Sequence, residues 1–426
     1  MRRTGPASTA ERLSTGFRAH AASHAVPVLL IAVATVVGAV CALIFQLVSA
    51  RALGPGAFGL LAAFLAILNV AAIASSALQN SVAVATAHAL TRPGWRDEPT
   101  SRWAPSDATV LGMGSAVLVG ACAPLLAASL DTTVPIVLIA AASIPLSFWL
   151  SDAVGVLQGI GKSTGAVAWT TASMLARVGL VLLAIAFDLG IGGVLASVVL
   201  GTGGAALGAH LVARRVPHPR RSVFTGTGMT VLLMTMCFAW LINADVIILR
   251  SAAPADVAGH YASAAILVKA AFMLPATLSL YLLPRFVRNR DNHRLVRVGE
   301  RLTIGITLLS GVALTLVFWL AGDLVVSLAY GSSFDQSGEY LVPLALVYIP
   351  WMTGQSVLIR LTADASRGAA LVTGGAVCCQ AVGFAVAMPD VGAVMWVQAA
   401  LGLVVVAALA ALAWRTRRSV AVGSEM

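Results

Sequence analysis

Residues 26–59 set the pattern that decides the fold: the apolar run VPVLLIAVATVVGAVCALIFQLVSA (26–50) leads directly into the break RALGPGAFG (51–59). A second apolar run follows at 57–89. A helix of about 20 apolar residues crosses the hydrocarbon core of a bilayer. Each run is therefore predicted to form a membrane-spanning helix, and the break is predicted to be the turn that joins them.

The same alternation of apolar runs and short breaks continues to the end of the chain. Of its 426 residues, 59% are apolar and 10% are charged, with a mean hydropathy of +0.92. Because a soluble domain carries about 25% charged residues, a soluble globular protein is excluded. We predict an all-α polytopic membrane protein with about 12 transmembrane helices. The predicted spans are 26–50, 57–89, 106–130, 134–157, 164–187, 190–213, 223–249, 257–283, 302–329, 338–362, 368–388 and 391–414.

Basic residues are distributed unevenly between the two sides of the predicted bundle. Of the 27 lysines and arginines, 22 fall on the side of the N-terminus. Since cytoplasmic loops retain the positive excess, we expect a multi-pass protein of the plasma membrane with both termini in the cytoplasm. The net charge of +10 then reflects topology, and no nucleic-acid partner is predicted. The opposite loops contain Asp131, Asp188, Asp256, Asp323, Asp335, Glu339 and Asp390. The preference for Arg over Lys, together with abundant Ala and Gly, indicates a bacterial source.

The predicted spans divide into two groups of six with the same topology. Arg51 and Pro55 after the first span are echoed by Arg250 and Pro254 after the seventh, at the same separation. Duplicated bundles of this kind enclose a central cavity between their two lobes. The predicted organisation is a cytoplasmic N-terminal tail (1–25), an N-terminal six-helix lobe (26–213), a cytoplasmic linker (214–222), a C-terminal six-helix lobe (223–414) and a cytoplasmic C-terminal tail (415–426).

Sequence signatures of catalysis and of cofactor binding are missing. The stretch GVLQGIGKS (155–163) resembles a phosphate-binding loop, but its first glycine is one residue too early and it joins two predicted spans. There is no HExxH and no Cys/His metal spacing, and the five cysteines all lie in apolar runs. We therefore predict no enzyme activity, no cofactor, no metal site and no disulfide.

Three stretches of the chain resemble a known family. They are RALGPGAFG (51–59), NADVIILR (243–250) leading through AGHYASA (258–264) to LPRF (283–286), and LAYGSSF (328–334). These stretches are similar to the polysaccharide-biosynthesis flippases of the multidrug/oligosaccharidyl-lipid/polysaccharide exporter superfamily. The resemblance implies a flippase that moves a polyprenyl-(pyro)phosphate-linked oligosaccharide across the plasma membrane, by alternating access, for cell-envelope polysaccharide biosynthesis.

The resemblance also implies a set of partners. These are the lipid-linked oligosaccharide substrate and the membrane lipids, with polysaccharide glycosyltransferases and a polymerase as further candidates. Two other functions stay open on the sequence alone. One is a small-molecule or multidrug exporter of the same superfamily, and the other is a non-transporting membrane scaffold for glycosyltransferases.

Three basic residues are predicted to lie inside spans: Arg177 in the fifth, Lys269 in the eighth and Arg360 in the tenth. A cation at the centre of a membrane helix costs about 2.5 to 3.5 kcal/mol on insertion scales, so each should face protein, water or a ligand. One interpretation is a cavity that receives the phosphates of the substrate. The other is that each cation neutralises a neighbouring carboxylate or extends to the interface. Asp152 and Asp245 are candidate charge partners, or sites for a coupling proton or sodium ion.

Arg51 and Arg250 follow the first and seventh spans, at the predicted external mouth. They are candidates for guiding a departing phosphate, and the alternative is a role as interface anchors. Arg360 is different, because Asp364 follows at the i+4 spacing of a local ion pair.

Polar side chains recur at helical spacing beside these charges. In the second span, Asn69, Ser76 and Asn80 are predicted to share one face. In the fifth span, Thr170 and Ser173 lie seven and four residues before the intramembrane arginine and share its face. These five residues are the predicted polar lining of the cavity. Hydrogen bonding between helices would produce the same pattern.

Overall fold

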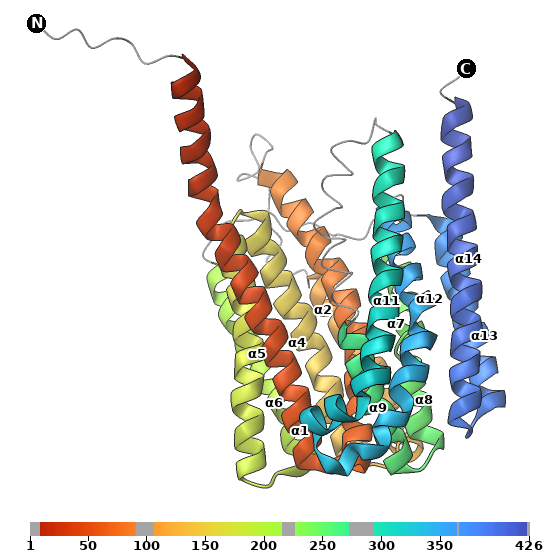
Figure 1. Ribbon diagram of the computed structural model, residues 1–426. Coiled ribbons are helices and arrows are strands. Elements are labelled where there is room, and N and C mark those ends of the chain that lie inside the picture. Colours follow the sequence, from red (N-terminus) through yellow and green to blue (C-terminus); the bar gives the residue numbers. More distant parts are fainter. Residues whose placement is uncertain (1–8, 91–105, 215–225, 272–292, 364–365, 424–426) are drawn as a thin grey trace, which may run out of the picture.

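The computed structural model describes residues 9–90, 106–214, 226–271, 293–363 and 366–423, and these residues contain helices and no β-strand (Figure 1). The predicted all-α class is therefore confirmed. The elements are α1 (Thr9–Leu90), α2 (Asp107–Ala121), α3 (Ala123–Ser129), α4 (Val134–Gly159), α5 (Ser163–Ala186), α6 (Gly190–Ala213), α7 (Gly226–Leu241), α8 (Ala244–Ala252), α9 (Ala255–Ala271), α11 (His293–Tyr330), the 3₁₀ helix η2 (Ser332–Ser337), α12 (Gly338–Ala363), α13 (Arg367–Ala387) and α14 (Val391–Gly423).

Within these described residues, eight helices are long and apolar enough to cross a membrane. The number rises to ten if two bent pairs each count as one span: α2 with α3, bent by 56°, and α7 with α8, bent by 44°. The predicted total of about 12 stays a prediction, because the predicted span 257–283 is described only to Ala271.

α1 consists of two arms that meet at Gly54. Its 82 residues would measure about 120 Å as one straight helix, far more than a bilayer requires. At Gly54 the backbone leaves the helical region, with φ 71° and ψ 174°, which glycine adopts without a steric penalty. Figure 1 shows the chain descending along the first arm and returning along the second. The turn predicted at 51–59 is therefore present.

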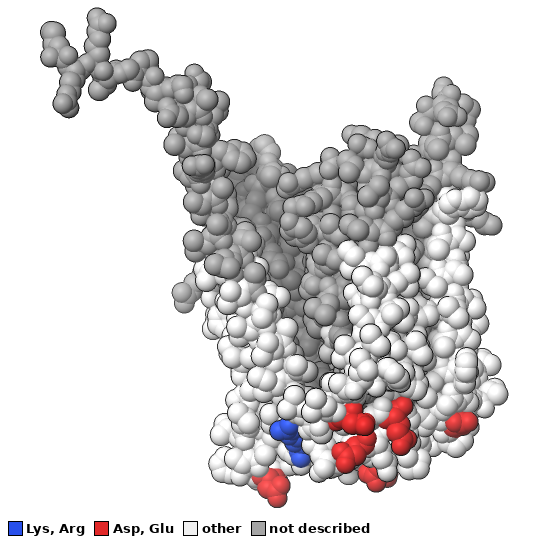
Figure 2. Space-filling view, viewed as in Figure 1, with Lys and Arg blue, Asp and Glu red and all other residues white. Residues whose placement is uncertain are grey.

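Charged residues separate between the two ends of the bundle. On the face shown in Figure 2, the described acidic side chains gather at the lower end. We call this the acidic end; it carries Asp131, Asp188 and Asp390 between helices and Asp335 in η2. Of the described exposed cations, Lys162, Arg214 and Arg367 lie at the opposite, basic end, whereas Arg51 is an exception at the acidic end. This separation matches the predicted loop pattern, whereas the assignment of the basic end to the cytoplasm remains a prediction.

Small residues allow the helices to approach closely. A Cβ atom on Gly155 would lie 2.6 Å from the carbonyl oxygen of Gln79, and one on Gly159 would lie 2.5 Å from the Cβ of Thr86. α4 therefore packs directly against the second arm of α1, as expected where hydrocarbon solvent gives no hydrophobic drive and close packing must hold helices together. The outward faces of other helices expose large apolar side chains to the lipid, including Leu182, Leu309, Leu371, Val386 and Val404.

Candidate functional site

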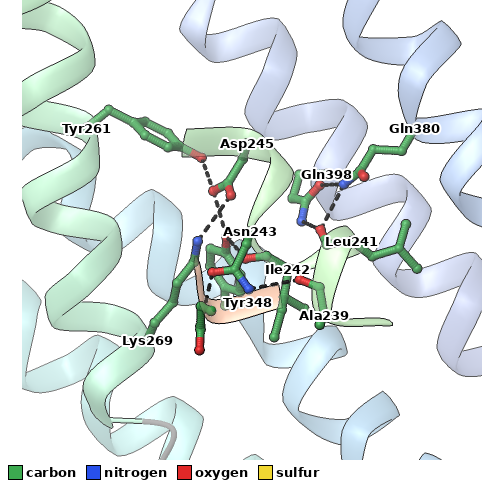
Figure 3. A network of polar contacts seen from close by, with 11 residues as sticks. Ala239, Leu241, Ile242, Asn243, Asp245, Tyr261, Lys269, Tyr348, Gln380 and Gln398 are labelled. Atoms are coloured by element: carbon green, nitrogen blue, oxygen red, sulfur yellow. Dashed lines mark hydrogen bonds and ion pairs between the residues drawn. The ribbon is translucent and has the colours of Figure 1, made fainter. Parts of the chain in front are cut away.

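The break between α7 and α8 is stabilised by side chains from two helices that lie far away in the sequence. Bending at this point leaves the carbonyl oxygen of Leu241 without its helical donor, and such a group must find another partner away from water. The side-chain amides of Gln380 (α13) and Gln398 (α14) both donate to it at 2.8 Å (Figure 3). The Gln380 amide also donates to the Gln398 side-chain oxygen at 2.8 Å, and the Trp351 indole donates to the Gln398 carbonyl at 3.1 Å.

Asp245 lies in the first turn of α8, directly after the break, and is fully buried. Its carboxylate accepts three hydrogen bonds: from the Tyr261 hydroxyl at 2.8 Å, from the Tyr348 hydroxyl at 2.6 Å and from Lys269 Nζ at 3.1 Å. The Tyr348 oxygen also lies 3.2 Å from the Ile242 carbonyl. Since a hydroxyl has one hydrogen, we assign it to the shorter contact with the charged carboxylate. The position at a helix N-terminus further stabilises the negative charge.

We call the polar side chains around the break the buried cluster (Figure 3); they are Asn243, Asp245, Tyr261, Lys269, Tyr348, Gln380 and Gln398. Lys269 forms an ion pair with Asp245 and lies at the edge of this cluster. Its side chain is 20% exposed, whereas that of Asp245 is 0% exposed. Its ammonium also lies 5.1 Å from the centre of the Tyr348 ring, within the range of a cation–π contact. Of the interpretations that the sequence left open, the structure therefore gives Lys269 an acidic partner. A role of Asp245 in proton or sodium coupling stays a prediction.

The polar face predicted for the second arm of α1 is exposed, although it lies in the interior of a helix. Asn69, Ser76 and Asn80 are all exposed, and the Ser76 hydroxyl donates to the Ala72 carbonyl of its own helix. Asn69 donates to the side-chain oxygen of Asn243 in the α7–α8 break at 3.4 Å, a long and therefore weak hydrogen bond. This hydrogen bond therefore joins the exposed polar face, in the N-terminal half, to the α7–α8 break, in the C-terminal half.

Arg177 is the intramembrane cation of the N-terminal half, on α5. Its Nη2 donates to the Thr202 hydroxyl of α6 at 2.7 Å, and that hydroxyl donates onward to the Val198 carbonyl at 2.6 Å. Its Nε is buried and has no hydrogen-bond partner in the described chain, and the same holds for the hydroxyl of Ser173, one turn earlier. A Cβ on Gly201 would lie 2.8 Å from Arg177 Cγ, so this glycine makes room for the side chain. Arg177 thus has no carboxylate partner among the described residues.

The two predicted mouth residues differ in their surroundings. Arg51 is exposed, and its guanidinium donates to the carbonyl oxygens of Leu328 and Ala329 at the end of α11. Arg250 is only 8% exposed, and its Nε has no hydrogen-bond partner in the described chain. The structure therefore supports the anchor interpretation for Arg51 and leaves a substrate contact of Arg250 as a prediction.

The remaining predicted residues contribute less to a site. Asp152 is half-buried on α4, and the Thr170 hydroxyl donates to the Val167 carbonyl of its own helix at 2.9 Å. The ion pair predicted between Arg360 and Asp364 lies outside the described side chains. The described residues contain no group of three or more His, Cys, Asp or Glu that could hold a metal ion.

Several residues of the cluster were not predicted from the sequence. Asn243 and Tyr261 stand in the stretches that carry the family resemblance, but no role was assigned to them. Tyr348, Gln380 and Gln398 lie singly in apolar runs. Their one available signal was that a polar side chain inside a span normally has a partner in the bundle.

Comparison with known proteins supports the fold. No family model and no curated protein matches the chain. An inward-facing multidrug resistance MATE family transporter of the MOP superfamily matches with a TM-score of 0.66 and 14% identity, over 89% of this chain and 94% of that chain. Lipid II flippase MurJ in an inward closed conformation matches with a TM-score of 0.64 and 12% identity, over 89% and 86%. An outward-facing MATE family transporter matches with a TM-score of 0.62 and 11% identity, over 94% and 97%. The chain therefore has the fold of MOP superfamily transporters, as the sequence resemblance implied.

Proposed function

We propose that the protein is a transporter that flips a polyprenyl-(pyro)phosphate-linked oligosaccharide across the plasma membrane by alternating access. The observation that carries this proposal is Arg177, a cation inside a membrane helix with no carboxylate partner among the described residues. An uncompensated charge in this environment is costly unless water or a counter-ion reaches it. A phosphate group of the cargo would supply the missing negative charge, and the unused guanidinium donors suit its oxygens.

Lys269 would provide a second contact. Its ammonium has three hydrogens, of which one is directed to Asp245, and its exposed fraction leaves the others accessible. If a phosphate draws the ammonium away, Asp245 keeps the hydroxyls of Tyr261 and Tyr348, so the carboxylate is not left without donors. This arrangement would allow the lysine to exchange partners as the cargo arrives and leaves.

The exposed face of Asn69, Ser76 and Asn80 would contact the sugar. Amide and hydroxyl side chains donate and accept hydrogen bonds, as sugar hydroxyl groups require. In this proposal the lobes 26–213 and 223–414 rock about the cluster while the polyprenyl tail stays in the lipid. Both termini would be cytoplasmic, and the substrate would enter from the basic end.

The fold alone fits a small-molecule or multidrug exporter equally well, because the similar structures include multidrug transporters. A cationic drug would need an acidic site. The one fully buried carboxylate of the described chain, Asp245, is already paired with Lys269 and accepts hydrogen bonds from two tyrosines. The charge of the described interior therefore favours an anionic cargo. A scaffold for glycosyltransferases would need neither cation.

A translocation assay on the purified protein in proteoliposomes separates these functions. The probe is a polyprenyl-pyrophosphate-linked sugar with a fluorescent head group, and a membrane-impermeant quencher reports the outer leaflet. We expect the wild-type protein and the control Arg214→Gln to accelerate translocation, and Arg177→Met to abolish the acceleration. Transport of a cationic dye without movement of the lipid would support the exporter. Movement of neither probe would support the scaffold.

A further inference from the structure

The two halves of the chain meet backbone to backbone at the acidic end. A Cβ on Gly259 in α9 would lie 1.9 Å from the carbonyl oxygen of Pro55, and one on Gly59 would lie 2.9 Å from the amide nitrogen of Gly259. Both distances are shorter than any side chain permits, so the second arm of α1 and α9 approach as closely as helices can. No space remains between the halves along this line.

Phe58 fills the adjoining space with an aromatic contact between the halves. It is fully buried, and its ring centre lies 5.9 Å from that of Tyr330 and 5.8 Å from that of Phe334. Phe334 in turn contacts the ring of His260, with 5.9 Å between centres. The Tyr330 hydroxyl donates to the Ser263 carbonyl at 3.1 Å, which fixes the ring. A side chain of the N-terminal half is therefore seated in an aromatic pocket of the C-terminal half.

Arg51 closes the outside of this contact. It lies in the last turn of the first arm of α1, and its Nε donates to the Ala329 carbonyl at 3.0 Å while its Nη2 donates to the Leu328 carbonyl. These are among the last carbonyls of α11, which have no donor within their own helix. A cation is also favoured at a helix C-terminus. Arg51 thus links the first span directly to a helix of the other half.

The repeat-related residue of the other half does not make the same contact in the described part of the chain. Arg250 occupies the position of Arg51 in the second repeat, yet it is buried and its Nε has no hydrogen-bond partner there. The arginine contact across the acidic end is therefore asymmetric: in the described chain it is made by Arg51 and not by Arg250.

We propose that the contacts around Arg51, Phe58 and Gly259 form a gate at the acidic end and that Arg51 is its latch. This inference rests on the proposed alternating access, which requires the halves to separate at this end. Among these contacts, that of Arg51 is exposed, so water can replace both of its hydrogen bonds when the halves part. The latch would hold the gate shut without making its opening prohibitively costly.

Distance measurements between spin labels test the latch without any cargo. The five native cysteines are replaced, and labels are attached at Thr133 and Gln336, two exposed acidic-end residues in different halves. The protein is purified in nanodiscs. Loss of a hydrogen bond from a charged donor shifts an equilibrium by about tenfold or less at an exposed site. We therefore expect Arg51→Gln to increase the ratio of long to short distances about three- to tenfold.

Arg214→Gln makes the same substitution at an exposed site of the basic end and should leave the distances unchanged. Arg51→Lys keeps the charge but not the planar fork, so an intermediate shift is expected, and it serves as the test if the glutamine variant does not fold. A distance distribution in both Arg51 variants equal to that of the wild type would overturn the latch. Absence of lipid translocation by the wild type would instead overturn the proposed function, because the distances are measured independently of cargo.

Discussion

Two cations that lie within helices of the described chain, Lys269 and Arg177, differ in how the chain compensates them. Lys269 has a buried carboxylate that is itself held by two tyrosine hydroxyls. Arg177 has one threonine hydroxyl, and its Nε has no partner in the described chain. The comparison teaches that a charge inside a span can be compensated by a buried counter-charge, as in Lys269, or left with a neutral hydroxyl alone, as in Arg177.

This difference has an energetic consequence. Removing one partner of a buried ion pair leaves an uncompensated charge and costs about 3 to 5 kcal/mol. Removing a cation that has no ionic partner carries no such penalty. Stability should therefore depend on the Lys269 centre, and transport should depend on the Arg177 centre.

The largest effect is expected for Asp245→Asn. The substitution leaves Lys269 without its counter-charge, so the free energy of unfolding should fall by about 3 kcal/mol or more. Denaturant unfolding of the purified protein in detergent measures this loss. The double variant Asp245→Asn/Lys269→Met removes both charges and should recover most of it. A single variant as stable as the wild type would show that the pair does not hold the fold.

The second effect concerns Arg177→Met, which keeps the long apolar stem and removes the charge. Lipid translocation should fall at least tenfold, equivalent to about 1.4 kcal/mol, while the unfolding temperature stays the same or rises. Translocation and thermal unfolding are measured on the same preparation, with Arg214→Gln as the matched control. Loss of stability together with unchanged translocation would reverse the roles given to the two cations.

A smaller effect is expected when the tyrosines lose their hydroxyls. Tyr348→Phe and Tyr261→Phe each remove one donor to Asp245 and should each cost about 1 kcal/mol of unfolding free energy. Tyr348→Phe should cost more, because its contact with the carboxylate is 2.6 Å and that of Tyr261 is 2.8 Å. Tyr340→Phe, on the same helix as Tyr348, is the control. Equal stability of all three variants would mean that the hydroxyls do not stabilise the carboxylate.

The smallest effect is expected for Asn69→Ala. Its hydrogen bond to Asn243 is 3.4 Å long and only partly buried, so the loss in unfolding free energy should be about 0.5 kcal/mol or less. Asn243→Ala should cost more, because the buried Asn243 amide also donates to the Ala239 carbonyl at 2.8 Å. If Asn69→Ala is the more damaging of the two, the connection across the halves is stronger than its geometry indicates.

Features that depend on local sequence pattern could be predicted from the sequence alone. The apolar runs and the break at Gly54 could be predicted because membrane length and glycine conformation are local properties. Arg177 and Lys269 could be recognised because a charge in an apolar run is conspicuous. The partner of Lys269 could not be chosen, because two aspartates were available and their depths depend on packing.

The contacts that build the cluster could not be predicted from local pattern, because they join residues far apart in the sequence. Tyr348 is 103 residues from Asp245 along the chain, and Gln380 and Gln398 are 139 and 157 residues from the carbonyl of Leu241. Only the packing of α12, α13 and α14 against the break brings them together. An isolated glutamine in an apolar run predicts that a partner exists, but it does not identify the partner.

The broken helix α7–α8 also has a consequence for the order in which the protein is synthesised. When this segment leaves the ribosome, Asp245 and the Leu241 carbonyl enter the membrane before Tyr348, Gln380 and Gln398 exist. Asp245 acquires Tyr261 and Lys269 as soon as α9 is made, but the Leu241 carbonyl lacks both of its glutamine donors until α13 and α14 are made, which disfavours a stable position in hydrocarbon. We therefore expect a nascent chain truncated before α13 to leave this segment less well integrated than the full chain does.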